Sequence, residues 1–245
     1  MERINKLLAR AGVASRRAVD GLLLEGRVTV NGQVVKELGT RIDPGKDAVK
    51  VDGKRIHLEA PTKVYVKMHK PQEVVTTLND HEGRRTVVDL LRGIRGRVFP
   101  VGRLDYWSEG LLFLTNDGDW AQELTHPSKH VDRVYQVKVR GMPSPRTLER
   151  LSRGLRLEGR RTAPAEFSIM RPGNNAWLHV TLREGRKNQI RRMLESVGHP
   201  VNRLRRVAIG GVEIGDLRPG RTRAITPAEL SRLEHALGKV PRRRN

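Results

Sequence analysis

The amino-acid sequence predicts an α+β protein with two domains. A small domain of helices and strands is predicted over residues 1–58 and, after a linker at 59–62, a larger domain over 63–238 with a mixed, largely antiparallel sheet flanked by helices. Two helical periods, followed by short apolar runs separated by Asn-Gly and Asp-Gly, indicate the small domain, since these dipeptides are strong tight-turn signals. Consecutive strand-like runs with short links indicate the antiparallel sheet. Residues 239–245 are predicted to form a basic tail.

The chain is strongly basic, with 245 residues and a formal net charge of +21 at pH 7. A charge of this size predicts polyanionic partners but does not bear on the fold. The sequence has no cysteine, which excludes disulfides, zinc ribbons and thiol catalysis. No segment approaches 18 consecutive apolar residues, and the N-terminus lacks the apolar core of a signal peptide. We therefore expect a cytoplasmic protein that associates with nucleic acid and not with a membrane.

The small domain begins with two helices. Apolar residues recur at helical spacing over residues 3–11, and Ser15 offers an N-cap to a second helix that extends from residue 16 to about residue 25. Strands are predicted at 28–30, 34–35 and 49–51. Residues 53–62 carry charge and a proline without any period, which indicates a connection between the domains.

Residues 7–35, LLARAGVASRRAVDGLLLEGRVTVNGQVV, resemble the small RNA-binding module named after ribosomal protein S4. In that family a loop and the second helix present basic residues to the RNA backbone, and such contacts position a protein without reading sequence. The alternative interpretation of these residues is a solvated, charged helix face. The resemblance implies RNA contacts at Arg10, Ser15, Arg16, Arg17 and Arg27.

The large domain alternates strand-like and helical segments. Its helices are predicted at 86–91, 119–124, 145–152, 187–197 and 227–237, and its strands at 64–68, 98–101, 111–114, 135–139, 165–170, 177–182 and 207–214. Between the second and third of these strands, Asp105 follows a Gly-Arg-Leu turn and lies beside Arg103. A carboxylate held there by a cation stays ionised and can act as a nucleophile or a base.

Three segments of the large domain resemble, in order, the signatures of the RsuA/RluB/RluE/RluF family of ribosomal RNA pseudouridine synthases. The first is GRLD at 102–105 with GLL at 110–112 and LTNDG at 114–118, the second is VYQV at 134–137, and the third is EGRKNQIRRM at 184–193, continuing to GHPV at 198–201. LRPG at 217–220 is a weaker match. The resemblance covers nearly the whole chain and is greatest to the RluB type, whose members act on the large subunit.

The resemblance implies an enzyme that converts uridine in RNA to pseudouridine by breaking the N1 glycosidic bond, rotating the uracil and rejoining it through C5. Asp105 is then the essential carboxylate, Tyr135 stacks on the target base, and Arg191 pairs with the carboxylate. Arg103, Arg186, Gln189 and Ile190 are the implied substrate contacts, and a uridine in structured RNA must first be flipped out. Whether Asp105 attacks C1′, adds to C6 or removes a ribose proton is left open.

No cofactor and no metal are expected, since the chemistry requires neither. His126 and His130 lie four residues apart, but Pro127 lies between them and no acidic base accompanies them. The chain departs from the family at Tyr106 and Trp107, at Ser108 and at Glu73, where a glycine is common.

The expected function is isomerisation of a specific uridine in large-subunit (23S) ribosomal RNA by a monomer that binds this RNA or an assembly intermediate. One alternative is a synthase for small-subunit (16S) RNA, which shares the two-domain plan. The other is a non-catalytic RNA-binding protein of ribosome assembly, which explains the net charge and residues 1–55 equally well.

Overall fold

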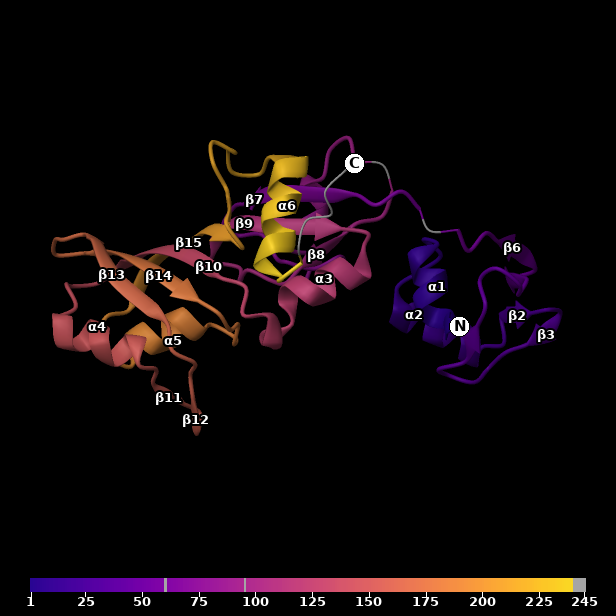
Figure 1. The fold of residues 1–245 in the computed structure, drawn as a ribbon, viewed down its shortest axis with the longest axis horizontal. Helices are drawn as coiled ribbons and strands as arrows, with labels where there is room; N and C mark the ends of the chain where they lie inside the picture. Colours follow the sequence, from indigo (N-terminus) through magenta and orange to yellow (C-terminus); the bar gives the residue numbers. More distant parts are fainter. Residues whose placement is uncertain (60, 95, 240–245) are drawn as a thin grey trace. The chain divides into compact units, whose positions relative to one another are not determined.

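The computed structural model describes residues 1–59, 61–94 and 96–239 (Figure 1). The chain divides into two compact units, one of which holds Met1–Val64 with two short later segments, while the other holds the rest. The division falls close to the predicted linker. Most of the predicted basic tail lies outside the described residues.

In the first unit, two helices pack against a small sheet. Ser15 caps the second helix as predicted, because its Oγ accepts a hydrogen bond of 3.1 Å from the Ala18 backbone N–H. Ile4, Leu7 and Leu23 are fully buried and form one core with the strands. The elements are α1 (Ile4–Arg10), α2 (Arg16–Leu24), β1 (Glu2–Arg3), β2 (Val28–Val30), β3 (Gln33–Val34), β4 (Arg41–Ile42), β5 (Val49–Val51) and β6 (Lys54–Ile56), with a four-stranded sheet in the order β3-β2-β5-β6.

The interpretation of residues 53–62 as an unstructured connection is wrong at its start. Asp52 and Gly53 have φ of 50° and 75°, and this turn folds β6 back on β5 in antiparallel register. Leu58 is buried in the core of the first unit. The charged strand was missed because its side chains lie at the edge of the sheet, where alternation is not imposed by burial.

The second unit is built on a mixed sheet. Its strand order is β13-β14-β10-β15-β9-β7-β17, with β16 paired to β15 and β8 paired to β9. β9 pairs with β15 in parallel, and the other pairs are antiparallel. The strands are β7 (Tyr65–Lys70), β8 (Phe99–Val101), β9 (Glu109–Thr115), β10 (Arg133–Val139), β13 (Glu166–Arg171), β14 (Trp177–Leu182), β15 (Val201–Ile209), β16 (Val212–Glu213) and β17 (Thr222–Ala224).

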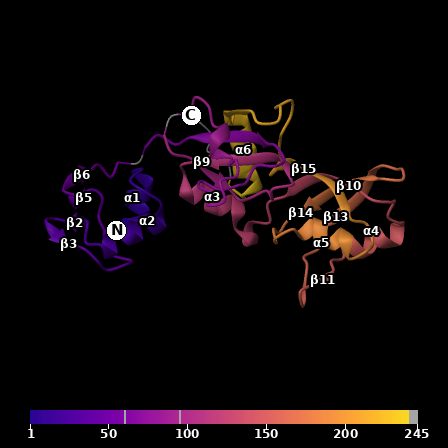
Figure 2. The same cartoon turned by 180° about the vertical axis from the view of Figure 1, so that it is seen from behind.

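Helices flank this sheet (Figures 1 and 2). They are α3 (Gly118–Thr125), α4 (Pro145–Ser152), α5 (Gln189–Glu195) and α6 (Pro227–Ala236), with single 3₁₀ turns at η1 (Val88–Leu90) and η2 (Pro127–Lys129). The helix predicted over 86–91 is therefore only one 3₁₀ turn. The helix predicted over 187–197 begins two residues later, because Asn188 has a left-handed φ of 53°. None of the helices in the described ranges is long and apolar enough to cross a membrane.

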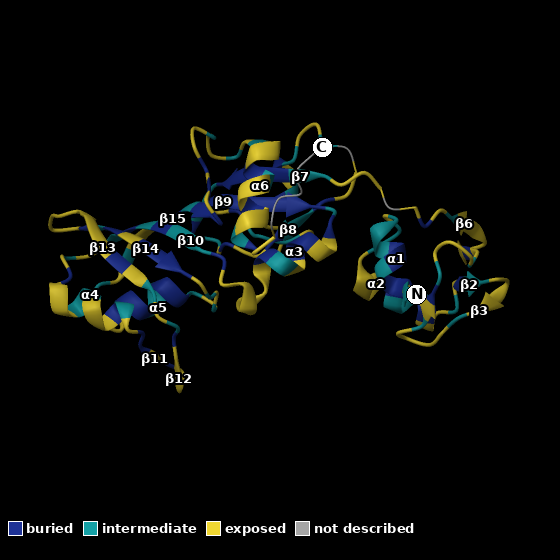
Figure 3. Ribbon diagram, in the orientation of Figure 1, coloured by how far each residue is buried: buried dark blue, intermediate teal, exposed yellow. Residues whose placement is uncertain are grey.

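Apolar packing joins the helices to the sheet. Trp120 of α3 and Leu233 of α6 belong to one buried cluster with Leu111 and Phe113 of β9. Most of β9 is coloured as buried in Figure 3. Next to this cluster, Gly110 has φ of 118°, and a Cβ there would lie 2.1 Å from the carbonyl oxygen of Arg206 on β15. Only glycine permits the two parallel strands to approach so closely. Gly110 thus allows β9, the strand that follows Asp105 in the chain, to lie close to β15.

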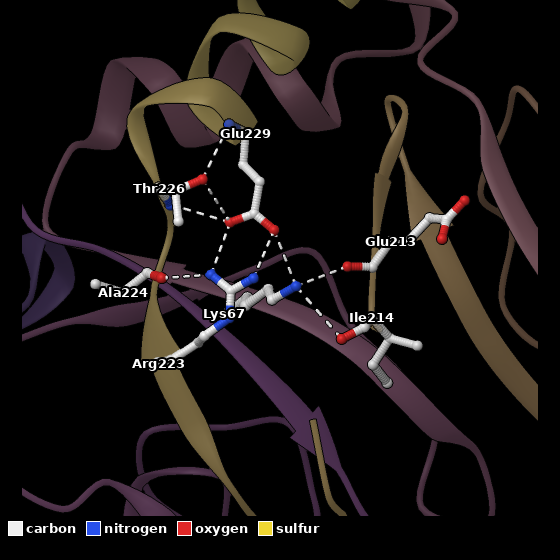
Figure 4. Close-up of polar contacts among 7 residues, drawn as sticks. All are labelled: Lys67, Glu213, Ile214, Arg223, Ala224, Thr226 and Glu229. Carbon is white, nitrogen blue, oxygen red and sulfur yellow. Dashed lines mark hydrogen bonds and ion pairs between the residues drawn. The ribbon is translucent and has the colours of Figure 1, made fainter. Parts of the chain in front are cut away.

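A buried polar network fixes the start of α6 to the sheet (Figure 4). The Lys67 side chain is only 3% exposed, and its Nζ donates to Glu229 Oε1 at 2.9 Å and to the carbonyl oxygen of Glu213 at 2.8 Å. Arg223 donates to both carboxylate oxygens of Glu229 at 2.8 Å, and Thr226 completes a capping box with Glu229. The Glu229 carboxylate therefore accepts hydrogen bonds from Lys67, Arg223 and Thr226.

This network makes stability depend on acid pH. Burial raises the pKa of Glu229, but hydrogen bonds from Arg223, Thr226 and Lys67 outweigh burial and lower the pKa to about 2 from 4.5. Stabilisation by Glu229 is therefore complete above pH 4.5 and is lost as the pH falls toward 2, with a size of about 3 kcal/mol. We expect urea unfolding of wild type, compared with Glu229→Gln, to show a stability gap at pH 7 that shrinks below pH 4.5. A gap that stays constant would contradict the network's role.

Candidate active site

The loop that carries Asp105 joins β8 to β9, as predicted from the two apolar runs. Gly102 begins the loop with φ of 72°, and the Ser108 backbone N–H donates to the Asp105 carbonyl oxygen at 3.0 Å. Leu104 is buried, and its carbonyl oxygen accepts a hydrogen bond of 2.7 Å from Thr76 Oγ1. The main chain on both sides of Asp105 is thus held in place, while its side chain is exposed.

Lys70 holds the backbone of this loop through hydrogen bonds, a role that was not predicted from the sequence. It is fully buried at the end of β7, and its Nζ donates to the carbonyl oxygens of Asp105 at 3.1 Å and Ser108 at 2.8 Å. Burial lowers the pKa of Lys70 to about 8, although the nearby Asp105 charge opposes this change. The only signal in the sequence was a lysine that ends an apolar strand just before Pro71.

Arg206 of β15 supports the loop from its other side and was also missed. It is 3% exposed, and its Nε donates to the Leu111 carbonyl oxygen at 2.7 Å, while Nη1 reaches the Arg103 carbonyl oxygen at 3.5 Å. Its Nη2 is buried without a hydrogen-bond partner among the described residues. The charge of Arg206 lowers the pKa of Lys70, so the two cations build a positive environment around the loop.

Arg191, the predicted partner of Asp105, lies on α5 and bonds to the same loop. Its Nη2 donates to the Trp107 carbonyl oxygen at 3.0 Å, and Nη1 reaches the Val201 carbonyl oxygen at 3.4 Å. Burial lowers the pKa of Arg191, and the Asp105 charge acts in the opposite direction. Among the described residues, the Asp105 carboxylate forms no ion pair within 4.0 Å. Arg191 therefore contacts the loop at the Trp107 carbonyl oxygen and not at the carboxylate.

Asp105 lies at a cavity of about 320 Å³ in the second unit. This size falls in the range of small-molecule sites. Tyr135, which is 8% exposed on β10, faces the cavity from the sheet and pairs in register with Arg206 of β15. The cavity brings together six of the seven predicted site residues; Arg191 lies outside its lining. The six are Arg103, Asp105, Tyr135, Arg186, Gln189 and Ile190.

Two of the predicted substrate contacts are already bonded within the protein. Gln189 is 3% exposed, donates to Glu184 Oε1 at 2.6 Å and accepts from the Arg186 backbone N–H at 3.1 Å. The Arg186 guanidinium bonds to the carbonyl oxygens of residues 160 and 161. Both residues therefore shape the edge of the cavity, whereas Arg103 and Lys187 line it with exposed side chains.

The predicted RNA contacts of the first unit differ in whether their side chains already bond to other residues of the protein. Arg16 and Arg17 are exposed at the start of α2. Arg27 instead forms ion pairs with Asp52 at 2.6 Å and Glu25 at 3.0 Å, and Arg10 pairs with Glu2 at 3.2 Å. The Ser15 hydroxyl caps α2. Arg16 and Arg17 are therefore the residues of this set most available to a phosphate backbone.

Two of the departures from the family pattern contact the Asp105 loop or belong to it. Glu73 adopts φ of 61°, a conformation that glycine adopts without steric cost, and its backbone N–H donates to the Tyr106 carbonyl oxygen at 2.9 Å. Tyr106 and Trp107 contact each other edge to face with ring centroids 4.9 Å apart, and Trp107 remains 58% exposed. Glu73 thus bonds to the loop that carries Asp105, and Tyr106 and Trp107 belong to that loop.

Comparison with known proteins identifies two families along the chain. Residues 64–196 match the RNA pseudouridylate synthase family, and residues 2–47 match the S4 domain. A crystal structure described as a pseudouridylate synthase superposes with a TM-score of 0.69 at 26% identity, covering 95% of this chain and 100% of that chain.

Relatives are similar over almost the full length. An uncharacterized RNA pseudouridine synthase of Aquifex aeolicus is 45% identical, covering 99% of this chain and 98% of the relative. The ribosomal large subunit pseudouridine synthase B of Bacillus subtilis is 42% identical, covering 95% of this chain and 96% of the relative. The fold, the cavity and these matches together show that the chain belongs to the RNA pseudouridine synthase family and carries an N-terminal S4 domain.

Proposed function

We propose that the protein isomerises a specific uridine of large-subunit ribosomal RNA, with Asp105 as the essential carboxylate. The observation that carries the proposal is the exposed Asp105, without an ion pair in the described ranges, at a cavity of about 320 Å³ that Tyr135 also lines. The Bacillus subtilis relative of similar length is named for the large subunit, which supports the choice of RNA.

The reaction conserves all atoms of the nucleotide. The C1′–N1 bond breaks, the C1′–C5 bond forms, the proton on C5 leaves and N1 gains a proton. Attack at C1′, addition to C6 and removal of a ribose proton each require a charged carboxylate close to the base–sugar junction. Asp105 meets the requirement for position because hydrogen bonds from Lys70 and Arg206 hold the main chain of its loop, while its side chain is exposed at the cavity.

Tyr135 and Ile190 provide the surfaces for the flipped base. Both line the cavity and are almost fully buried, so a uracil that enters between them exchanges water for apolar contact.

The two domains divide the work of binding and catalysis. We propose that residues 1–58 bind RNA backbone through the S4 domain, with Arg16 and Arg17 as contacts, and that residues 63–238 hold the flipped uridine. Contacts of this kind add affinity that weakens as salt rises, without selecting a base. The choice of uridine is therefore assigned to the catalytic domain.

The test is a pseudouridine map of full-length ribosomal RNA transcripts after incubation with the purified protein. We expect one new pseudouridine in the large-subunit transcript and none in the small-subunit transcript. A product only in the small-subunit transcript would replace the substrate. No product in either transcript would contradict the proposed function.

A further inference from the structure

A short arginine-rich hairpin projects from the second unit beside α4 and α5 (Figures 1 and 2). It comprises residues 153–162 and contains β11 (Arg156–Leu157) and β12 (Arg160–Arg161), a pair that the sequence did not predict. Four arginines and one glutamate occur within residues 153–161. All four arginines are exposed, and the exposed tip is visible in Figure 3. We refer to this segment as the arginine hairpin.

The arginine hairpin is a tight, pre-formed structure rather than a loose loop. Glu158 and Gly159 have φ of 49° and 77°, the positive pair of a two-residue hairpin turn. Leu155 and Leu157 are buried, and the Leu155 N–H donates to Thr162 Oγ1 at 3.0 Å. The arginine side chains are therefore presented from a backbone that is ordered before any ligand arrives, which reduces the entropic cost of binding.

Hydrogen bonds connect the arginine hairpin to the edge of the catalytic cavity. The Arg186 guanidinium donates to the carbonyl oxygens of Arg160 and Arg161, and Glu184 Oε1 accepts from the Ala163 N–H at 2.9 Å. Arg186 and Glu184 both line the cavity. The hairpin and the cavity edge thus form one continuous structure.

Three of the hairpin arginines lack a carboxylate partner. Arg153 pairs with Glu149, and the hairpin's own Glu158 is neutralised by Arg192 of α5 at 2.8 Å. Within the described part of the chain, Arg156, Arg160 and Arg161 form no ion pair. Their charge is therefore available to an external anion. Guanidinium groups suit phosphate because they can donate two parallel hydrogen bonds.

We propose that the arginine hairpin is a second RNA-binding surface, which contacts backbone phosphates of the substrate next to the flipped uridine. The proposal rests on the proposed function and adds to it a binding site within the catalytic domain. Its contacts are to phosphate, so they raise affinity and position the RNA but take no part in the bond changes. An acidic protein surface is the competing partner, and the RNA experiment below decides between them.

The experiment compares two triple variants in single-turnover pseudouridine formation on the large-subunit transcript at several salt concentrations. The test variant is Arg156→Gln/Arg160→Gln/Arg161→Gln. The matched control removes the same charge from exposed positions that do not line the cavity and is Arg92→Gln/Arg221→Gln/Arg232→Gln. We expect the test variant to need about tenfold more enzyme for half-maximal rate in about 0.1 M salt, with a salt slope lower by about two. Its rate at saturation should match wild type within about twofold, because phosphate contacts only position the RNA.

A second variant tests whether weaker RNA binding results from a change in folding. Arg160→Glu alters a side chain that has no hydrogen bond or ion pair in the described part of the chain, so we expect unchanged melting and weaker RNA binding. If the test variant and Arg160→Glu bind RNA no more weakly than the control, the arginine hairpin is not an RNA surface. If wild type itself forms no pseudouridine in this assay, the proposed function fails instead, so the two failures are distinct.

Discussion

Asp105→Asn should form no pseudouridine while it binds the large-subunit transcript as wild type does. Asparagine keeps the size and the loop bonds of the residue, since those bonds use the main chain, but it removes the anion. Each of the three first steps open to Asp105 needs that anion, so we expect a loss of at least about 10⁴-fold in single-turnover rate. RNA affinity should change by less than about threefold, because binding rests on phosphate contacts. Rapid-quench assays and equilibrium binding on the same RNA measure both quantities.

The control for this variant is Asp216→Asn, which removes an equal charge from an exposed position outside the cavity lining. It should retain the wild-type rate. If Asp105→Asn kept a rate within about tenfold of wild type, the carboxylate would not be essential, and the assigned role would be wrong.

Lys70→Met should lower activity far more than stability. Methionine fills a similar volume but donates no hydrogen bond, so the carbonyl oxygens of Asp105 and Ser108 lose their buried partner and the loop shifts. A displacement of about 1 Å at the reacting group can cost about 10²-fold in rate. Removal of a buried charge offsets the lost bonds, so we expect a change in unfolding free energy of about 1 kcal/mol or less. Single-turnover kinetics and urea unfolding measure the two effects.

Lys67→Met is the matched control, because Lys67 is a second buried lysine of β7 that bonds to the α6 network instead of the Asp105 loop. It should show the opposite result, with a stability loss of about 2 kcal/mol and nearly wild-type activity at permissive temperature. Equal activity losses in both variants would show that Lys70 acts only through general stability and not through the loop.

Most regular elements could be predicted from the sequence because burial imposes a period on them. The alternation at 135–139 and the apolar run at 111–114 correspond to β10 and β9, and Ser15 caps the helix that it was predicted to cap. The position of Asp105 between two strands followed from the same apolar runs. Tyr135 and Ile190 were predicted as site residues from the family motifs that occur in order along the chain. In the structure, both residues line the same cavity as Asp105.

The supports of the site could not be predicted because they are tertiary. Lys70 and Arg206 lie 35 residues before Asp105 and 95 residues after Leu111, and only the completed sheet brings their side chains to the loop. Because both residues are charged, the sequence alone suggests that they lie at the surface. The arginine hairpin was missed because its two strands are two residues each, too short for a period to appear.

The most direct test of the central claim is the ribosomal RNA pseudouridine map of a strain that lacks the gene, complemented with wild type or with Asp105→Asn. We expect deletion to remove one pseudouridine from large-subunit RNA, wild type to restore it, and Asp105→Asn to leave it absent, although the variant is produced and folded. Restoration of the site by Asp105→Asn would show that the carboxylate is not essential, and a map with no lost site would show that the protein does not modify ribosomal RNA.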